Sequence, residues 1–247
     1  MNQYDNIPGV RRSALWEIRK SPAHYQYAVT HMDEPTPALL FGIAAHKYIL
    51  EPDTFWQEYA LTPEVDRRTK AGKEEWNAYI AGLGDKTGLS YKDYITIEDM
   101  SNAIKANPTA SELLQGKHEV PVTWTDPETG ELCKCRLDCI HGHTIVDYKT
   151  TASCAGFDFE RSCRIYGYKL QAAMYTEGMF QNSLEEYDFA FVAQEKKAPY
   201  AVRVYRCDPA WVQEGMEIYR ELMAIYHECR VTGNWYGYED KELIADE

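Results

Sequence analysis

The sequence predicts a mixed α/β fold, in which a central mixed β-sheet is flanked by helices and preceded by a helical N-terminal part. Apolar residues follow a helical period over residues 39–50, 73–83 and about 97–115. From Glu119 onward the period changes to two, which is typical of strands. A chain of 247 residues with 45% hydrophobic content can bury a sizeable core. We therefore expect one domain over residues 1–247.

The helical part is expected to cover residues 1–117. Ser13 is a candidate N-cap for the first helix, because a hydroxyl at that position can accept a backbone N–H of the first turn. Ser21-Pro22 is expected to end this helix and to begin the next. Residues 39–50 contain small residues that permit close packing, so they are expected to form a buried helix that carries His46.

The sheet and its flanking helices are expected to cover residues 118–238. Alternating patterns and turn residues predict strands at residues 119–124, 132–140, 144–149, 187–194 and 200–206. Helices are predicted around residues 168–179 and 209–231. Residues 239–247 contain five acids and one lysine, and we expect them to form a frayed acidic tail.

Two carboxylates and one ammonium group are predicted to converge on this sheet. Asp147 and Lys149 project to the same side of their strand, and the preceding hairpin brings Asp138 alongside them. Two carboxylates can hold a hard divalent cation, and a lysine beside it can orient a nucleophile and stabilise negative charge. A salt bridge on a surface strand is the alternative interpretation of this triplet.

These residues occur in an order that resembles the PD-(D/E)xK nuclease signature, with Asp138 followed by Asp147-Tyr148-Lys149. Other elements of the RecB-like branch of that superfamily also occur in the order expected along the chain: His46 and Glu119 before Asp138, and Gln171 and Tyr175 after Lys149. Taken singly, His46 would be typical of a hydrogen-bonded core histidine, and Gln171 with Tyr175 of an ordinary helix face. Leu137 stands where the proline of the signature is expected.

The resemblance narrows to the RecE-type exonucleases, also called exodeoxyribonuclease VIII, of phages and prophages, and it covers nearly the whole chain. It rests on the segments at residues 13–22, 41–46 with Glu51-Pro52, 67–73, 147–151 and 166–175. It implies the PD-(D/E)xK nuclease fold and an exonuclease that degrades the 5′-ended strand of linear duplex DNA and leaves 3′ single-stranded tails. The implied cofactor is Mg²⁺, with Mn²⁺ as an expected substitute.

The same resemblance implies roles for individual residues. Asp138, Asp147 and the carbonyl of Tyr148 would bind the metal, His46 would bind it or position a ligand, and Glu119 would contribute to it. Lys149 would be the catalytic lysine, and Gln171 and Tyr175 would arrange the site or contact DNA. The implied partners are double-stranded DNA ends, a single-strand annealing protein, and further copies of the chain in a ring of three or four subunits.

The net charge of −13 argues against a generally basic, DNA-binding surface. A compact basic cluster is nevertheless present in the residues Arg67, Arg68, Thr69, Lys70 and Lys73. Exposed donors before a helix can bind phosphate, so we predict that this cluster contacts DNA; a solvated basic loop is the alternative. Arg11 and Arg12 are weaker candidates for the same role.

Composition and motifs leave few other classes of protein. No N-terminal signal and no apolar run long enough to span a membrane is evident, so we expect the cytoplasm of a bacterial or phage-infected cell. The seven cysteines include no CxxC pair and none precedes Cys133, which disfavours an iron–sulfur RecB-like nuclease. A non-catalytic DNA-binding recombination protein is the remaining alternative, and the intact Asp138, Asp147 and Lys149 argue against it.

Overall fold

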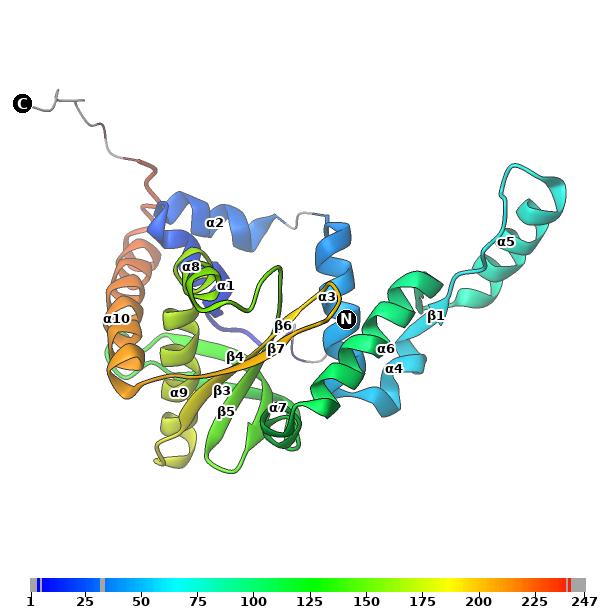
Figure 1. Ribbon diagram of the computed structural model, residues 1–247. Helices are drawn as coiled ribbons and strands as arrows, with labels where there is room; N and C mark the ends of the chain where they lie inside the picture. The colour runs from blue at the N-terminus through cyan, green and yellow to red at the C-terminus, as the bar shows by residue number, and fades with distance from the viewer. Residues whose placement is uncertain (1–3, 5, 32–33, 239, 241–247) are drawn as a thin grey trace, which may run out of the picture.

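A five-stranded mixed sheet of order β3-β4-β5-β6-β7 forms the centre of the molecule (Figure 1). The computed structural model describes residues 4, 6–31, 34–238 and 240, so the expected acidic tail, except for residue 240, lies outside the described residues. The strands are β3 (Lys117–Thr125), β4 (Leu132–His141), β5 (Thr144–Thr151), β6 (Asp188–Glu195) and β7 (Val202–Arg206). Only the β5–β6 pair among them is parallel. The predicted mixed sheet with flanking helices is confirmed.

One face of the sheet is covered by helices from both ends of the chain. The crossover from β5 to β6 supplies α8 (Gly156–Tyr166) and α9 (Tyr168–Ser183), and α10 (Pro209–Thr232) packs on α9. The N-terminal helices α1 (Arg12–Leu15) and α2 (Pro22–Thr30), with the 3₁₀ helix Trp16–Arg19 between them, join the same core. Leu170, Phe189, Phe191 and Tyr219 are buried there, each contributing roughly 1.5–3 kcal/mol.

Close packing of α10 on α9 depends on a glycine. A Cβ atom on Gly215 would lie 2.2 Å from the backbone oxygen of Lys169, so any side chain at this position would push the two helices apart. Because α9 carries Gln171, the spacing of this helix pair also fixes one wall of the site described below.

The opposite face of the sheet packs on a second group of helices. α3 (Pro37–Leu50), α6 (Tyr91–Ala106) and α7 (Pro108–Leu113) supply apolar residues that cover Val146, Tyr148, Ala190 and Val192. α3 and α6 also share a separate small core with α4 (Pro52–Glu58), built around Phe55, Ile97 and Met100. α3 is therefore held between the sheet and a helical lobe of its own.

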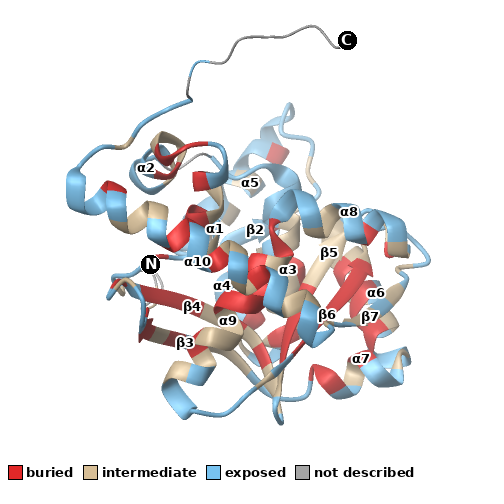
Figure 2. Cartoon of the chain, turned by 90° about the vertical axis from the view of Figure 1, so that its left-hand side faces the viewer, coloured by how far each residue is buried: buried red, intermediate tan, exposed pale blue. Residues whose placement is uncertain are grey.

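An arm extends from this lobe, away from the sheet (Figure 1). It comprises β1 (Tyr59–Leu61), α5 (Lys70–Leu83) and β2 (Thr87–Leu89), and β1 pairs with β2 in parallel. Most of α5 is exposed to solvent (Figure 2). No helix in the described part of the chain is both long enough and apolar enough to cross a bilayer.

Three local predictions about the helices were wrong. Ser13 lies inside α1, whose N-cap is Arg11, because Val10 is tied to β4 by a bridge to Cys133 and the helix starts directly after it. The helix expected at residues 97–115 is interrupted at Asn107, whose side chain caps α7. The helix at residues 39–50 is present, but its first half is not buried: Leu39, Leu40 and Ile43 are exposed.

Candidate active site

The candidate site lies where β4 and β5 stop pairing. Their ladder ends at the pair Cys139 and Val146, so Asp138 and Asp147 are the next residues in register. In place of a further ladder bond, the backbone N–H of Tyr148 donates to Oδ2 of Asp138 at 2.9 Å. The side chain of Asp138 thus satisfies a strand donor that the diverging backbone leaves free, and this bond fixes its carboxylate beside Asp147.

Asp147 is held in a dry environment. Its side chain is 2% exposed, Nε2 of Gln171 donates to Oδ1, and Nζ of Lys149 lies 2.6 Å from Oδ2. The ammonium group of Lys149 also lies 5.0 Å from the ring centroid of Tyr168. Burial and the neighbouring Asp138 carboxylate raise the pKa of Asp147 to about 6, although Lys149 opposes this shift. The structure therefore brings Asp138, Asp147, Lys149 and Gln171 together.

His46 reaches the same point from the helical lobe. Its Nε2 lies 2.9 Å from Oδ2 of Asp138. Burial lowers the pKa of His46, but the carboxylates of Asp138 and Glu119 outweigh it and raise that pKa above its usual value. Burial likewise raises the pKa of Asp138, yet His46, Lys149 and the Tyr148 N–H together hold it below its usual value. The two side chains thus stabilise each other's charged forms.

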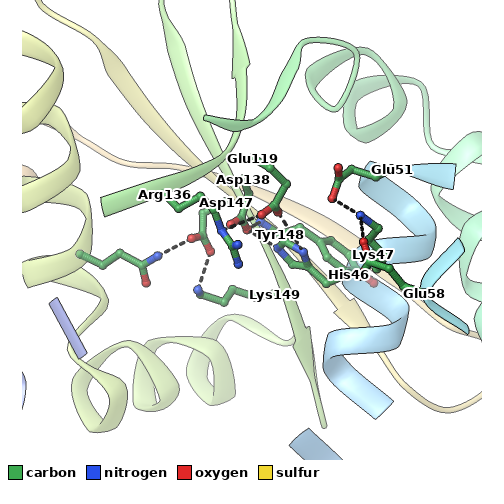
Figure 3. A network of polar contacts seen from close by, with 11 residues as sticks. His46, Lys47, Glu51, Glu58, Glu119, Arg136, Asp138, Asp147, Tyr148 and Lys149 are labelled. Atoms are coloured by element: carbon green, nitrogen blue, oxygen red, sulfur yellow. Dashed lines mark hydrogen bonds and ion pairs between the residues drawn. The ribbon is translucent and has the colours of Figure 1, made fainter. Parts of the chain in front are cut away.

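α3 is anchored next to His46 by a branched ion pair. Nζ of Lys47 lies 2.9 Å from a carboxylate oxygen of Glu51 and 2.7 Å from one of Glu58 (Figure 3). Glu51 follows the last residue of α3 and Glu58 is the last residue of α4, so Lys47 links the two helices. This link helps to fix the end of α3 that carries His46.

Glu119 completes the cluster from β3. The register of β3 and β4 places it opposite Asp138, and its backbone has a φ of 53°. One carboxylate oxygen lies 3.4 Å from Nδ1 of His46 and the other 2.7 Å from Nε of Arg136 (Figure 3). Burial raises the pKa of Glu119, while His46 and Arg136 oppose the shift.

The donor set fits a divalent metal ion. Three ligand atoms, one each from His46, Glu119 and Asp138, lie within 4.8 Å of one another. Asp147 is next to Asp138 in the register of β4 and β5. Carboxylate oxygens suit Mg²⁺ and Mn²⁺, and an imidazole nitrogen is compatible with Mn²⁺. The carboxylates of Glu119, Asp138 and Asp147 are balanced here by His46, Arg136 and Lys149, an arrangement that a dication could replace in part.

Comparisons with known proteins identify the domain. Residues 12–244 match the PDDEXK-like domain of unknown function (DUF3799). The chain belongs to this family. A candidate exonuclease from Eubacterium rectale has the same fold, with a TM-score of 0.64 and 15% sequence identity, and the match covers 96% of this chain and 91% of that one. The structure of SSO0001 is 12% identical over 85% of both chains, and its TM-score of 0.32 supports no inference. No curated protein matches the chain.

As a PDDEXK-like domain, the chain departs from the name-giving motif at Leu137. That side chain is fully buried among the helices on the α9 face, so leucine fills a core position without disturbing Asp138. Tyr148 contributes its N–H to the site, while its hydroxyl donates to Gln194 on the other face of the sheet. The predicted role of its carbonyl as a metal ligand stays a prediction. Tyr175 is one turn beyond Gln171 on α9 and packs against Phe189.

The predicted basic cluster does not reach the site, because it begins α5 in the arm (Figure 1). Thr69 caps α5 by accepting the N–H of Gly72, and a Cβ on Gly72 would lie 2.1 Å from the backbone oxygen of Asp66. The guanidinium of Arg68 binds the carboxylate of Asp66, and that of Arg67 lies over the ring of Trp76. Part of this motif therefore has a structural explanation.

Four other cations, two from the cluster and two near the N-terminus, differ in accessibility. Lys70 lies 3.9 Å from Glu74, and Lys73 is exposed on the first turns of α5. Arg12 donates to the backbone oxygen of Tyr166 and so anchors α1 to the α8–α9 junction, whereas Arg11 is exposed. Arg12 is thus better explained as a structural anchor than as a DNA contact.

Sequence reasoning missed Arg136 as a member of the site. Its signal was its position two residues before Asp138 in the same predicted strand, combined with its positive charge among several acids. The three cysteines of that strand divide between two cores: Cys133 and Cys135 face the α9 side, and Cys139 faces the α7 side. The strand therefore changes face around Asp138, which alternation alone does not predict.

Proposed function

We propose that this chain is a metal-dependent DNA nuclease of the RecE type, which degrades linear duplex DNA from the 5′ end and leaves 3′ single-stranded tails. The observation that carries the proposal is the convergence of Asp138, Asp147 and Lys149 with His46 at one point of the sheet. The polarity and the tails rest on the sequence resemblance to RecE-type exonucleases.

The residues divide the chemistry among them. Asp138 and Asp147 would hold the metal with His46 and Glu119, and a bound dication would polarise the scissile phosphate and acidify a water molecule. Gln171 keeps Asp147 in place through its amide N–H. Lys149, drawn to the same carboxylate, is the group that would orient the attacking water and stabilise charge on the phosphate. A non-catalytic DNA-binding protein would have no need for the costly burial of Asp147.

The direct test uses duplex DNA labelled at one strand end at a time. With Mg²⁺ or Mn²⁺, the protein should shorten linear duplexes from the 5′-ended strands and leave covalently closed circles intact. Loss of label from the 3′ ends first would reject the polarity alone. A protein that cleaves no linear DNA with either metal would reject the enzyme.

The arm is the proposed DNA-binding surface. Arg67 and Lys73 support this role. Neither is within ion-pair distance of a carboxylate among the residues that the structure describes, so both charges are available to pair with phosphates. Replacing both with alanine should weaken duplex binding and reduce the salt dependence of log K by about two. Arg203→Ala with Arg206→Ala, at two exposed positions on edge strand β7, is the matched control and should leave binding unchanged.

We further propose self-association into a ring of three or four subunits, and cooperation with a single-strand annealing protein in the bacterial cytoplasm. The exposed aliphatic residues Leu39, Leu40 and Ile43 on α3 support self-association, since they would be buried in a subunit contact. Light scattering should give three or four times the monomer mass, and Leu39→Glu with Ile43→Glu should reduce it. A wild-type protein of monomer mass would reject the ring.

A further inference from the structure

Arg136 forms an ion pair with Glu119, the residue of the cluster that β3 supplies. Its Nε lies 2.7 Å from Oε2 of Glu119, while Oε1 of the same carboxylate faces Nδ1 of His46 at 3.4 Å. The two oxygens therefore have different partners, with Arg136 on one side and the candidate metal ligands on the other (Figure 3). Holding Oε2 fixes the direction in which Oε1 points.

Glu119 needs such a restraint because its backbone is strained. A φ of 53° is unfavourable for a residue with a β-carbon, and it persists only where surrounding contacts determine it. The residue sits opposite Asp138, at the point where β4 changes face. The backbone alone would not keep this carboxylate aimed at the site.

Arg136 is in turn oriented from its other side. Its guanidinium carbon lies 5.4 Å from the ring centroid of Tyr4, and its side chain is 37% exposed against 15% for Glu119. Exposed ion pairs commonly contribute little to stability. This pair differs because its acidic member is largely buried and belongs to the group His46, Glu119 and Asp138.

We propose that Arg136 is a positioning residue of the metal site: it holds Glu119 so that Oε1 is presented to the metal. The proposal rests on the proposed function, because it requires that the site bind a divalent cation. Arg136 acts through Glu119 and contacts neither the metal nor the reacting phosphate.

The experiment measures Mn²⁺ binding to the full chain by titration calorimetry, without DNA. Arg136→Ala should weaken binding about tenfold, the usual size of an effect at the partner of a metal ligand, and Glu119→Gln, which alters the ligand itself, should weaken binding at least as much. Arg136→Lys should recover part of the loss, because an ammonium group can still pair with Glu119 but lacks the fork geometry. Adding Arg136→Ala to Glu119→Gln should change the Kd by less than about twofold, because the two residues act as one unit.

Arg220→Ala is the matched control. Nε of Arg220 lies 2.9 Å from a carboxylate oxygen of Glu128 in an exposed pair outside the site, so its loss should leave the Mn²⁺ Kd unchanged. Circular dichroism and melting temperature establish that each variant is folded, and Arg136→Lys serves if the alanine variant is not. At saturating Mn²⁺, the KM of Arg136→Ala for DNA should equal that of the wild type.

Two results would overturn the assignment. An unchanged Mn²⁺ Kd in Arg136→Ala, with normal binding and cleavage by the wild type, would reject it and leave the proposed function intact. Fully additive losses in the double variant would show that Arg136 acts independently of Glu119. A wild-type protein that binds no Mn²⁺ and cleaves no DNA would instead reject the proposed function.

Discussion

Asp147 and His46 lie in the same site, yet the molecule supports them in different ways. Asp147 lies on β5, a central strand with neighbours on both sides, and is 2% exposed. His46 lies on α3, whose packing is shared with the separate core of the helical lobe, and its side chain is 28% exposed. The sheet thus supplies a dry carboxylate, and the lobe supplies a more accessible imidazole.

Of these two residues, Asp147 is the one whose burial lowers the stability of the folded protein. A buried carboxylate whose pKa is raised to about 6 destabilises the fold when it is ionised. Such a cost is compatible with selection for a function that needs the charge. His46, by contrast, is stabilised in its charged form by the acids around it.

The largest effect is expected from Asp147→Asn. The amide keeps the shape of the side chain and can still accept from Gln171, but it removes a charge that the proposed metal site needs. Cleavage of linear duplex DNA should fall on the order of 10³-fold. Asp188→Asn, at an exposed position at the start of β6, is the control and should cleave normally. Comparable activity in the two variants would contradict the role of Asp147.

The same variant should be more stable than the wild type in EDTA at pH 7–8. Because the folded-state pKa of Asp147 is raised, its ionisation costs stability as pH rises from about 4 through about 6. The gain should be on the order of 1–3 kcal/mol above pH 7 and should vanish below about pH 4, where the aspartic acid is neutral in both states. Urea unfolding at several pH values measures it, and a pH-independent gain would argue against burial as the cause.

His46→Ala tests the accessible half of the site. Losing one ligand or its orienting group should weaken Mn²⁺ binding on the order of 10–100-fold, and excess Mn²⁺ should restore part of the cleavage rate. His143→Ala is the control, since that imidazole is exposed in the turn between β4 and β5 and pairs with Glu185. A rate that excess metal does not restore would assign His46 to catalysis rather than to binding.

Metal affinity should rise with pH. His46 and Asp147 both have raised pKa values, so each retains its proton to higher pH than usual and must release it to bind a metal. Below about pH 6, each proton that must be released before the metal binds should weaken the apparent Mn²⁺ affinity about tenfold per pH unit. Calorimetry in buffers of different ionisation enthalpy counts the protons. The slope should become shallower in Asp147→Asn.

The smallest effect on the metal is expected from Tyr148→Phe. Its hydroxyl donates to Oε1 of Gln194 at 2.7 Å, and Gln194 in turn donates to the backbone oxygen of Met100 in α6. Removing the hydroxyl leaves a buried amide oxygen unsatisfied and should cost about 1–3 kcal/mol of stability. The Mn²⁺ Kd should stay within about twofold of wild type. A large change in Kd would mean that the sheet and the lobe are coupled through this bond.

The sheet was predictable because alternation is a local property of sequence. The pattern around Asp147 and Lys149 specified their common face, and the resemblance supplied the order of His46, Asp138 and Gln171. What alternation could not give was the change of face at Asp138 or the strained φ of Glu119, since both depend on contacts between strands. Arg136 was overlooked for the same reason.

The helices were predicted less completely. Asn107-Pro108 carried a readable signal for a helix break, as a capping residue followed by a proline at the first helical position. β1 and β2 carried none, because each has three residues and pairs with a strand distant in sequence. α8 was also missed. Whether residues 67–73 bind DNA stays a prediction, because their sequence pattern is in part explained by the cap of α5.

The pairing of β1 with β2 makes the arm a separable module. Tyr59 is in register with Thr87 and Leu61 with Leu89, so the strand that leads out of the lobe and the strand that leads on to α6 lie side by side and run in the same direction. Because parallel neighbours are joined by a crossover and not by a tight turn, any segment that replaces the one between the two strands needs a dozen or more residues. The remaining chain would keep the sheet, α3 and every residue of the candidate metal site. Grafting arms from related proteins onto this stem is then a practical way to test whether the arm contacts DNA.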